Sequence, residues 1–216
     1  MNSKVELLSH FGDDLMIVNV ARVSYGKYKE KFTSGDKNLI NFLIKHGHSS
    51  PFRHPQLQFR IKCPIYVERQ IFKHEIGVQK NSISGRYVDF SDSYDVPQQL
   101  RYQSVDSKQG SAGNLNMAEN EFFVDKMEKL VAEGAGLYKE MVDFGISKEQ
   151  CRTILPLCLE TTFIWTGSLQ AFLHMCDLRL KPDAQKETRD VVANMLDLVK
   201  NIKGKPFKET LKAWNA

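Results

Sequence analysis

The stretch KHGHSSPFRHPQLQFRIKCPIYVERQIFKHEIGVQKNSISGRY, residues 45–87, decides how this chain is built. Leu57–Cys63 alternates apolar with polar residues, which predicts a half-buried strand. Ile65–His74 has the apolar spacing of a helix, and Pro64 stands where proline favours a first helical turn. Histidines and cationic side chains gather at both ends of these two elements. Because rigid scaffolds usually present reactive side chains on element ends and loops, we expect a site here.

The bulk properties of the chain are those of one ordinary globular domain. Its 216 residues suffice for a single core with a small helical annex, and 42% of them are hydrophobic and 26% charged. No apolar run reaches the roughly 20 residues that span a bilayer, and the first residues, MNSKVELLSH, lack a signal-peptide apolar segment. We therefore expect a cytoplasmic protein. A net charge of +4 suits an anionic small molecule such as a nucleotide, without requiring nucleic acid or a membrane as partner.

Neither the cysteines nor the histidines are arranged as metal ligands. Cys63, Cys151, Cys158 and Cys176 lack the paired spacing of a zinc site, so we interpret them as small core residues. Three histidines lie close together in residues 46–54, but carboxylates at a fitting spacing are missing. The sequence therefore predicts no metal site.

Periodicity outlines the rest of the chain. Besides the strand at residues 57–63, we expect strands at Lys4–Phe11, Val88–Tyr94 and Cys158–Trp165. Besides the helix at residues 65–74, we expect a helix capped by Asp13 or Asp14 and another capped by Ser34 or Asp36. Met117–Phe144 should form one helix, or two that are broken near Gly134 and Gly136. Later helices are expected after a capping box at Ser147–Gln150, at Ser168–Leu178, from Asp183 onward and at Pro206–Ala216.

A polar stretch at residues 94–117 separates the two halves of this pattern. It is rich in Gln, Ser, Gly and Asn, and a loop of this length in a compact domain is usually a lid, a binding loop or disordered. We expect it to be a flexible loop within one domain that covers residues 1–216. The expected fold class is α+β, with a mixed or antiparallel sheet flanked by helices and a helical annex.

The motifs of residues 45–87 resemble those of the flavin-dependent thymidylate synthases, the ThyX family. That family carries HGHxxPFEH, a strand, a helix that ends RQxFRHR, and a loop that ends NExSxRY. The corresponding residues here are His46–His48, Pro51–His54, Arg69–Glu75 and Asn81–Tyr87. This chain departs from the family in Lys73-His74-Glu75 where RHR is usual, in Ser82 where the loop glutamate is usual, and in a loop one residue longer.

Two further segments resemble the same family. Ala21–Gly26 reads ARVSYG, as in the family. Residues 151–189 follow the pattern ARxxLPxxxYTxFxWxxNxRxxxNFxxLRxxxxAQxEIR. The positions that match are Leu155, Pro156, Thr161, Phe163, Trp165, Leu178, Arg179, Ala184, Gln185, Glu187 and Arg189. Because separate blocks agree in order and internal spacing, the resemblance covers most of the chain.

The resemblance implies a nucleotide site. Family arginines at the positions of Arg152 and Arg179 hold the nucleotide, and the second approaches the pyrimidine ring and helps to ionise it at N3. Arg179 is therefore the catalytic candidate. The backbone of Ser84 and Gly85, together with Arg86, would bind the 5′-phosphate. The positions implied to bind dUMP are Ser24, Gln70, Lys73, Ser82, Ser84, Gly85, Arg86, Arg152 and Arg179.

The implied FAD site contains the clearest departures. Family members have asparagine, arginine and asparagine at the positions of Ser168, Gln170 and His174, and arginine at that of Glu75. Two cations are thereby lost and an anion is gained, which opposes binding of a diphosphate. Lys73, His74, His48 and Lys80 are the groups available to compensate. The positions implied to bind FAD are His48, Ser50, Lys73, His74, Glu75, Ser82, Ser168, Gln170 and His174.

The activity that the resemblance implies is the reductive methylation of dUMP at C5 to give dTMP. The carbon would come from 5,10-methylenetetrahydrofolate, the hydride from reduced FAD, and NADPH would reduce the flavin again. The family works as a homotetramer with sites between subunits. The altered flavin positions leave two alternatives open. One is a relative that uses another pyrimidine nucleotide such as dCMP or adds a hydroxymethyl group, and the other is a nucleotide-binding protein without turnover.

Overall fold

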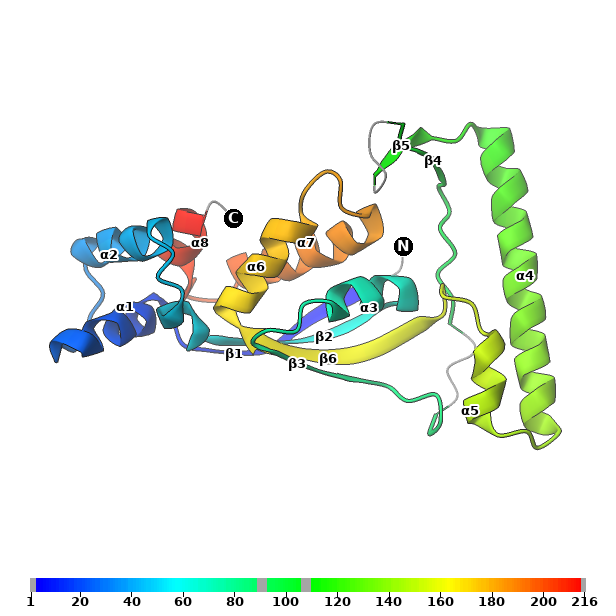
Figure 1. Cartoon of the computed structure of the whole chain (residues 1–216), viewed down its shortest axis with the longest axis horizontal. Coiled ribbons are helices and arrows are strands. Elements are labelled where there is room, and N and C mark those ends of the chain that lie inside the picture. Colours follow the sequence, from blue (N-terminus) through cyan, green and yellow to red (C-terminus); the bar gives the residue numbers. More distant parts are fainter. Residues whose placement is uncertain (1–2, 89–92, 106–109, 215–216) are drawn as a thin grey trace.

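A four-stranded antiparallel sheet organises the computed structural model, which describes residues 3–88, 93–105 and 110–214 (Figure 1). The strands lie in the order β1 (Lys4–Phe11), β2 (Gln56–Pro64), β6 (Glu160–Ser168) and β3 (Val78–Ser82). In register, β2 pairs Phe59 with Trp165 of β6. The sheet therefore joins the two sequence blocks side by side, and the expected α+β class is confirmed.

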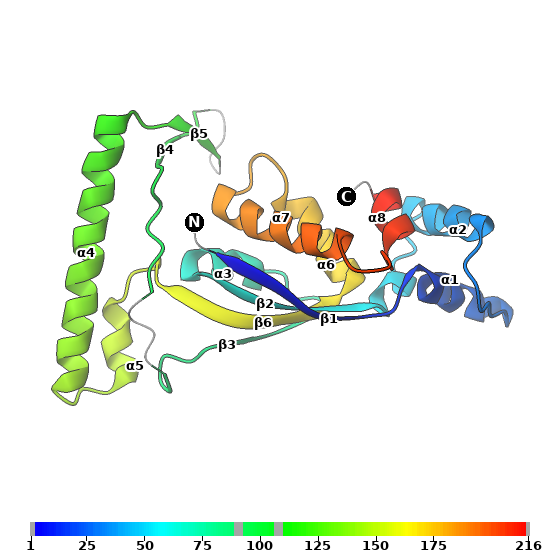
Figure 2. The ribbon, with the colours of Figure 1, turned by 180° about the vertical axis from the view of Figure 1, so that it is seen from behind.

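The helices fall into three groups (Figures 1 and 2). Three of them cover one face of the sheet: α3 (Ile65–Phe72), α6 (Leu169–Arg179) and α7 (Lys186–Lys200). A second group lies at one end: α1 (Asp14–Arg22), α2 (Ser34–Lys45) and α8 (Lys208–Trp214). At the other end stand α4 (Met117–Asp143) and α5 (Lys148–Cys151), beside the ribbon of β4 (Arg101–Gln103) and β5 (Ser111–Asn114). Short 3₁₀ turns are η1 (Val23–Tyr25), η2 (Ser50–Arg53) and η3 (Arg152–Ile154).

The core lies between the sheet and its helices. The expected alternation in β2 is confirmed, because Leu57, Phe59 and Ile61 are buried while the residues between them are not. Phe59 packs against Trp165 of β6 and Phe172 of α6, with ring centroids 5.9 Å apart in both pairs. Burying each of these aromatic side chains contributes about 1.5–3 kcal/mol. The four cysteines are also buried with free thiols, which confirms their interpretation as core residues.

The helical end of the molecule is closed by a buried carboxylate. Asp14, at the start of α1, accepts hydrogen bonds from the backbone N–H of Glu209 at 2.7 Å and of Thr210 at 3.1 Å. The Thr210 hydroxyl donates a third at 2.6 Å. Asp14 therefore caps the first turn of α8 from 195 residues away along the chain.

Several expected elements differ in extent. The cap of α2 is Thr33, with Asp36 as its partner in the capping box, and α7 begins at Lys186 rather than Asp183. Residues 117–143 form one continuous helix through both glycines. Ser147 precedes α5 but makes no side-chain bond to the helix backbone, so the expected capping box is wrong. Within residues 94–117, expected to lack regular structure, β4 and β5 form a ribbon.

The second expected loop contains the fourth strand of the sheet. β3 (Val78–Ser82) was expected to be part of a loop, but it pairs with β6 from Val78 opposite Gly167 to Ser82 opposite Phe163. The strand expected at Val88–Tyr94 falls largely on residues 89–92, outside the described residues, and Tyr94 forms a single bridge to Leu159. Of the helices that the structure describes, none is long and apolar enough to cross a membrane.

Candidate functional site

Arg179, the last residue of α6, is held by two neutral acceptors on α3 and the turn after it. Its Nε donates to Nε2 of His74 at 2.9 Å, and its Nη2 donates to the backbone carbonyl of Gln70 at 3.2 Å. Burial, together with the positive charge of Arg179, lowers the pKa of His74 to about 4. His74 is therefore a neutral hydrogen-bond acceptor at pH 7. It orients the guanidinium without neutralising its charge.

Gln70 connects this arginine to the loop before α7. Its side-chain amide donates to the side-chain carbonyl of Gln185, which brings the two sequence blocks into direct contact. Gln185 lines a cavity of about 660 Å³ whose walls are mostly apolar. At the rim of that cavity, Arg101 forms an ion pair of 2.8 Å with Glu187. The geometry therefore links an oriented cation, through Gln70 and Gln185, to a pocket large enough for a planar ring.

The side chains of α6 extend this polar cluster toward the first turn of the helix. His174 lies beside His74, with ring centroids 6.4 Å apart. One turn earlier, the side-chain carbonyl of Gln170 accepts a hydrogen bond of 2.7 Å from Nε of Arg53, in η2. Nη2 of Arg53 also donates to the Ser49 hydroxyl at 3.1 Å. Two polar clusters therefore lie along α6, one of Arg53 and Gln170 near its first turn and one of His174, His74 and Arg179 toward its last turn.

Ser168 has a structural role at the N-terminus of α6. Its hydroxyl accepts a bond of 3.2 Å from the backbone N–H of Ala171 and so caps α6. Its own N–H donates to the carbonyl of Gly77 at 3.0 Å, and a Cβ at Gly77 would lie 3.1 Å from its hydroxyl. Ser168 therefore fixes the turn after α3 against α6, and it is 5% exposed.

A cationic cavity lies on the other side of that turn. Its volume is about 650 Å³, and its charged lining residues are Arg69, Lys73, Glu75 and Lys80. Lys80 donates to the carbonyl of His74 at 3.0 Å, while burial lowers the pKa of Lys80 and the charge of Glu75 acts in the opposite direction. Three cations against one carboxylate leave a net positive cavity. This excess fits an anionic group, so the residues present are compatible with a negatively charged ligand such as FAD.

The expected phosphate-binding turn lies at the end of β3. The N–H groups of Tyr87 and Val88 both donate to the carbonyl of Ser84, at 3.0 and 3.1 Å. Gly85 is buried inside this turn, while Arg86 is exposed with its guanidinium 5.4 Å from the ring centroid of Tyr87. The hydroxyl of Ser82, just before the turn, donates to Glu68 of α3 at 2.7 Å. The hydroxyl proton of Ser82 is therefore already used in a hydrogen bond within the same chain.

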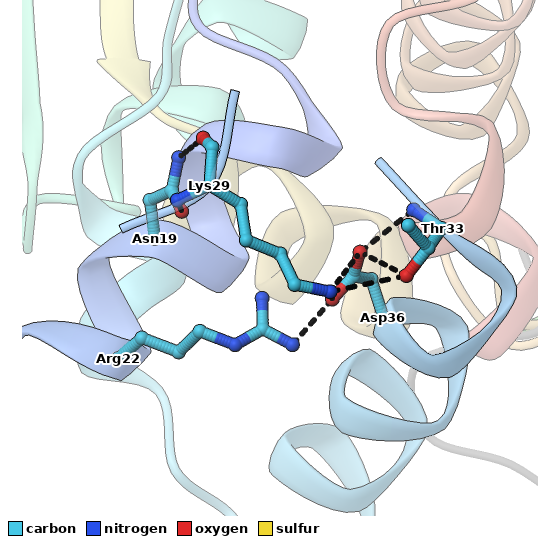
Figure 3. A network of polar contacts seen from close by, with 5 residues as sticks. All are labelled: Asn19, Arg22, Lys29, Thr33 and Asp36. Atoms are coloured by element: carbon cyan, nitrogen blue, oxygen red, sulfur yellow. Dashed lines mark hydrogen bonds and ion pairs between the residues drawn. The ribbon is translucent and has the colours of Figure 1, made fainter. Parts of the chain in front are cut away.

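The ARVSYG segment lies at the opposite end of the molecule from α4 and α5 (Figure 1). Ser24 is exposed in η1. The arginine of the motif, Arg22, is ion-paired with the buried Asp36, which also binds Lys29 and the backbone and hydroxyl of Thr33 (Figure 3). These contacts fix the connection between α1 and α2 and thereby the position of Ser24.

The remaining predicted residues lie at the surface. His48 stacks on Phe42 with centroids 5.8 Å apart, and Ser50 is exposed at the start of η2. Arg152 is exposed as well, at the C-cap of α5 and the first position of η3.

One chain therefore assembles only part of the predicted set. The residues brought together are Gln70, His74, His174 and Arg179, while Gln170 contacts Arg53 instead. The structure places Arg86 in the turn after β3, Arg152 in η3 and Ser24 in η1, each exposed and on a separate element.

The structure adds site residues that had no assigned role in the sequence. These are Arg53, Gln185 and Glu68, which orient Gln170, Gln70 and Ser82 respectively. Two of them were inside quoted motifs, because Arg53 is in PFRH and Gln185 follows Ala184. The motifs fixed their positions, but only the folded chain shows their partners. Across residues 3–88, 93–105 and 110–214, no group of three His, Cys, Asp or Glu side chains is arranged to hold a metal ion.

Comparison with known proteins agrees with this arrangement. The sequence model of the family described as thymidylate synthase complementing protein matches residues 6–203. A flavin-dependent thymidylate synthase of Thermus thermophilus is 38% identical over 196 residues, which cover 91% of this chain and 71% of the relative. The enzyme of that name from Thermosipho africanus is 34% identical over 196 residues, covering 91% and 85%.

Solved structures share the fold. The UMP/dUMP methylase PolB from Streptomyces cacaoi bound with 5-Br UMP has a TM-score of 0.85 at 23% identity, covering 99% of this chain and 94% of the other. Its form bound with 5-Br dUMP has a TM-score of 0.86 at 24% identity, covering 99% and 95%. Since the family model spans most of the sequence and the relatives exceed 30% identity over 91% of it, this chain belongs to the flavin-dependent thymidylate synthases, a family of methyltransferases.

Proposed function

We propose that this enzyme methylates dUMP at C5 to give dTMP, with 5,10-methylenetetrahydrofolate as carbon donor and NADPH as reductant of the flavin. When bound, reduced FAD supplies the hydride. The observation that carries the proposal is the state of Arg179. Neutral acceptors hold it in a fixed direction, so its full positive charge is available to a ring that becomes electron-rich.

Arg179 acts on the pyrimidine in this proposal. Its guanidinium has five N–H donors, of which the contacts to His74 and Gln70 use two. The remaining donors stabilise negative charge at N3 and O4 of the ring, and this stabilisation favours attack by C5. Gln70 and Gln185 connect the guanidinium to the cavity that Gln185 lines. Preorganised donors of this kind contribute about 10²–10³-fold to turnover.

The nucleotide phosphate binds at the turn after β3. Arg86 is exposed, whereas the backbone N–H groups of Tyr87 and Val88 already donate to the carbonyl of Ser84. The guanidinium of Arg86 is therefore the group that supports binding of a dianion at this turn. Loss of this interaction in Arg86→Ala weakens dUMP binding by about 1.5–3 kcal/mol, the range for hydrogen bonds to charged groups. Calorimetric titration with dUMP measures the change, and an unaltered dissociation constant contradicts the role of Arg86.

The working site combines several copies of the chain, and a homotetramer is the proposed assembly. Arg86 and Arg152 are exposed on elements separate from the Arg179 cluster, which supports contributions from different subunits. An exposed apolar seam on α4 supports the same conclusion. Its members, one every seven residues, are Phe123, Leu130, Leu137 and Phe144. A seven-residue apolar repeat is the pattern of a helix that packs along another helix.

The seam is complementary to itself when a second copy of α4 packs along it in the antiparallel direction. Phe123 would then face Phe144 of the second copy, and Leu130 would face its Leu137. This self-complementarity is what a two-fold interface requires.

The experiment that tests the reaction measures both cofactor and product. A flavin absorbance spectrum of the purified protein, taken with and without dUMP, reports the cofactor and the substrate together. Mass spectrometry then identifies the product formed with methylenetetrahydrofolate and NADPH from dUMP, UMP and dCMP in parallel. A gain of one methyl group on dUMP alone supports the proposal. Turnover of dCMP, or a hydroxymethyl product, replaces it with the related one-carbon transferase activity.

The role of Arg179 has its own test. Arg179→Ala should reduce kcat at least about 100-fold while FAD still binds, because the proposed partner of this side chain is the pyrimidine. Arg60→Ala is the matched control, since Arg60 is an exposed arginine of β2 paired only with Glu6. Equal turnover in the two variants contradicts the ring-stabilising role.

A further inference from the structure

Arg53 is a cation that the fold orients but does not neutralise. Its Nε bonds to the amide oxygen of Gln170 and its Nη2 to the hydroxyl of Ser49, and both acceptors are uncharged. In the part of the chain that the structure describes, no carboxylate is ion-paired with Arg53. These two bonds use two of the five guanidinium N–H groups, so three donors remain for a ligand.

Three other arginines of the chain are each paired with a carboxylate. Arg22 is paired with Asp36, Arg60 with Glu6, and Arg101 with Glu187. An ion pair of this kind cancels the charge that an anionic ligand would require. Arg53 shares its neutral mode of orientation with Arg179, at the other end of α6. Arg53 and Arg179 therefore place one unneutralised positive charge near each end of α6.

The sequence departures explain why a cation is needed at this position. The family pattern has an acid where this chain has Arg53, and an arginine where it has Gln170. In this chain Arg53 replaces the acid and Gln170 replaces the arginine. The Nε of Arg53 lies 2.7 Å from the side-chain oxygen of Gln170, so the cation is now contributed by the other member of the pair. The positive charge that α6 lacks at Gln170 is thereby supplied from η2.

We propose that Arg53 binds the diphosphate of FAD and replaces the cation that is absent at position 170. This inference rests on the proposed flavin-dependent function and extends it to a residue specific to this chain. Arg53 provides parallel N–H donors to a dianion, as arginine does for phosphate groups. Ser49 and Gln170 are positioning residues, because they fix the plane of the guanidinium before the ligand arrives.

The dimensions of α6 agree with an extended ligand. Gln170 and His174, four positions apart, lie on one side of α6, whereas Arg179, nine positions and about 13.5 Å of helix rise beyond Gln170, lies on the opposite side. A flavin dinucleotide is a ligand of this kind, because its ring system and its diphosphate are separated by a flexible chain. The diphosphate lies at the Arg53 end, and the ring lies toward His174 and His74. The pyrimidine nucleotide then lies beyond them, at Arg179.

The test compares ligands that do and do not carry the diphosphate. FAD and riboflavin are titrated into the protein and followed by flavin fluorescence, and inorganic pyrophosphate is used as a competitor. Arg53→Ala should weaken FAD binding about 10- to 100-fold, the range for losing a charge-assisted contact, while riboflavin binding stays unchanged. Arg60→Ala, the control, should leave the binding of both ligands unchanged. Pyrophosphate should compete with FAD in the parent and much less in Arg53→Ala.

A charge-relocation variant sharpens the test. Arg53→Ala combined with Gln170→Arg returns a cation to α6 and should recover most of the lost FAD affinity. Equal FAD affinity in the parent and Arg53→Ala overturns the role of Arg53, while flavin dependence stands. An equal loss of FAD and riboflavin binding assigns Arg53 a structural role and also overturns the proposal. A parent protein that binds no flavin overturns the proposed function together with this inference.

Discussion

Strand β6 and helix α4 differ in how much of their side-chain surface is buried within one chain. Six of the nine residues of β6 are buried, whereas α4 buries only Val124 and Tyr138 among its 27 residues. The apolar side chains of β6 face a core made by their own chain. Most of those of α4 remain at the surface, with Leu130 67% and Phe122 54% exposed. The sheet region is complete within one chain, while α4 has the composition of an element that is completed by another copy.

The difference separates two kinds of information in one sequence. Apolar residues in the sheet and its helices encode the fold of a single chain. Apolar residues on α4 support the proposed assembly, because an exposed row of large side chains on a globular protein usually marks an interaction site. Substitutions should therefore affect different properties in the two regions. The predictions below compare them in order of decreasing effect on the stability of the chain.

The largest loss is expected in the core. Phe172→Ala should lower the free energy of unfolding by about 3–5 kcal/mol, because Phe172 is fully buried between Phe59 and Trp165. The control is Phe122→Ala on α4, where the same side chain is 54% exposed and should cost less than about 1 kcal/mol. Urea denaturation of both variants measures the contrast. Similar losses in the two would remove the distinction between the regions.

A smaller loss is expected at the helical end of the sheet region. Burial alone raises the pKa of Asp36, but donors from Thr33, Lys29 and Arg22 outweigh it and hold this pKa below its usual range. Asp36→Ala leaves the Arg22 charge without its partner and should cost about 2–3 kcal/mol. Glu6→Ala, which removes an exposed pair with Arg60, should change stability by less than about 1 kcal/mol. Chemical denaturation at pH 7 distinguishes the two, and equal effects would contradict the burial argument.

A pH effect is expected at the site itself. The pKa of His74 is about 4 in the folded protein and near 6.5 in the unfolded chain, so the unfolded chain binds the extra proton between these values. The folded state therefore loses stability as pH falls from about 6.5 toward about 4. His74→Gln should show a shallower decline over this window than the parent. His54→Gln, at an exposed histidine, should decline like the parent, and identical slopes in all three would contradict the assignment.

The smallest effect on the chain, with the largest effect on assembly, is expected on α4. Leu130→Glu should change the unfolding free energy of the chain itself by less than about 0.5 kcal/mol, because this residue is already exposed. The buried charge should nevertheless prevent association, seen by light scattering as a lower mass. Ala132→Glu places the same side chain off the seam on an exposed position and should keep the parent mass. Assembly that survives Leu130→Glu would show that α4 serves another purpose.

Much of the sheet region was predictable from sequence because local pattern and tertiary environment agree there. Lys4–Phe11 was placed correctly, and the alternation around Phe59 identified the core face of β2. The strand β3 was missed because its sequence, VQKNS, has no strong apolar alternation. It is a strand because β6 offers it an edge to pair with, and that information lies in residues more than 80 positions away.

The candidate site was predictable only in part for a similar reason. The motifs identified Arg179 and Gln70, and the structure brings these two together. They did not reveal that His74 accepts a bond from Arg179, since this contact depends on how α6 packs beside α3. The continuous course of α4 through Gly134 also could not be read locally. A Cβ there would lie 3.6 Å from the carbonyl of Ile154, so the glycine adjoins η3 rather than interrupting the helix.

The cap that Asp14 forms on α8 has a consequence for how the chain is made. The carboxylate of Asp14 leaves the ribosome early, but its three donors at Glu209 and Thr210 appear only after most of the polypeptide has been synthesised. Until then α1 has a polar group that must remain hydrated, and the packing around it cannot close. Folding of this end during translation is therefore postponed to the final stage, when the late-emerging segment docks against the first helix.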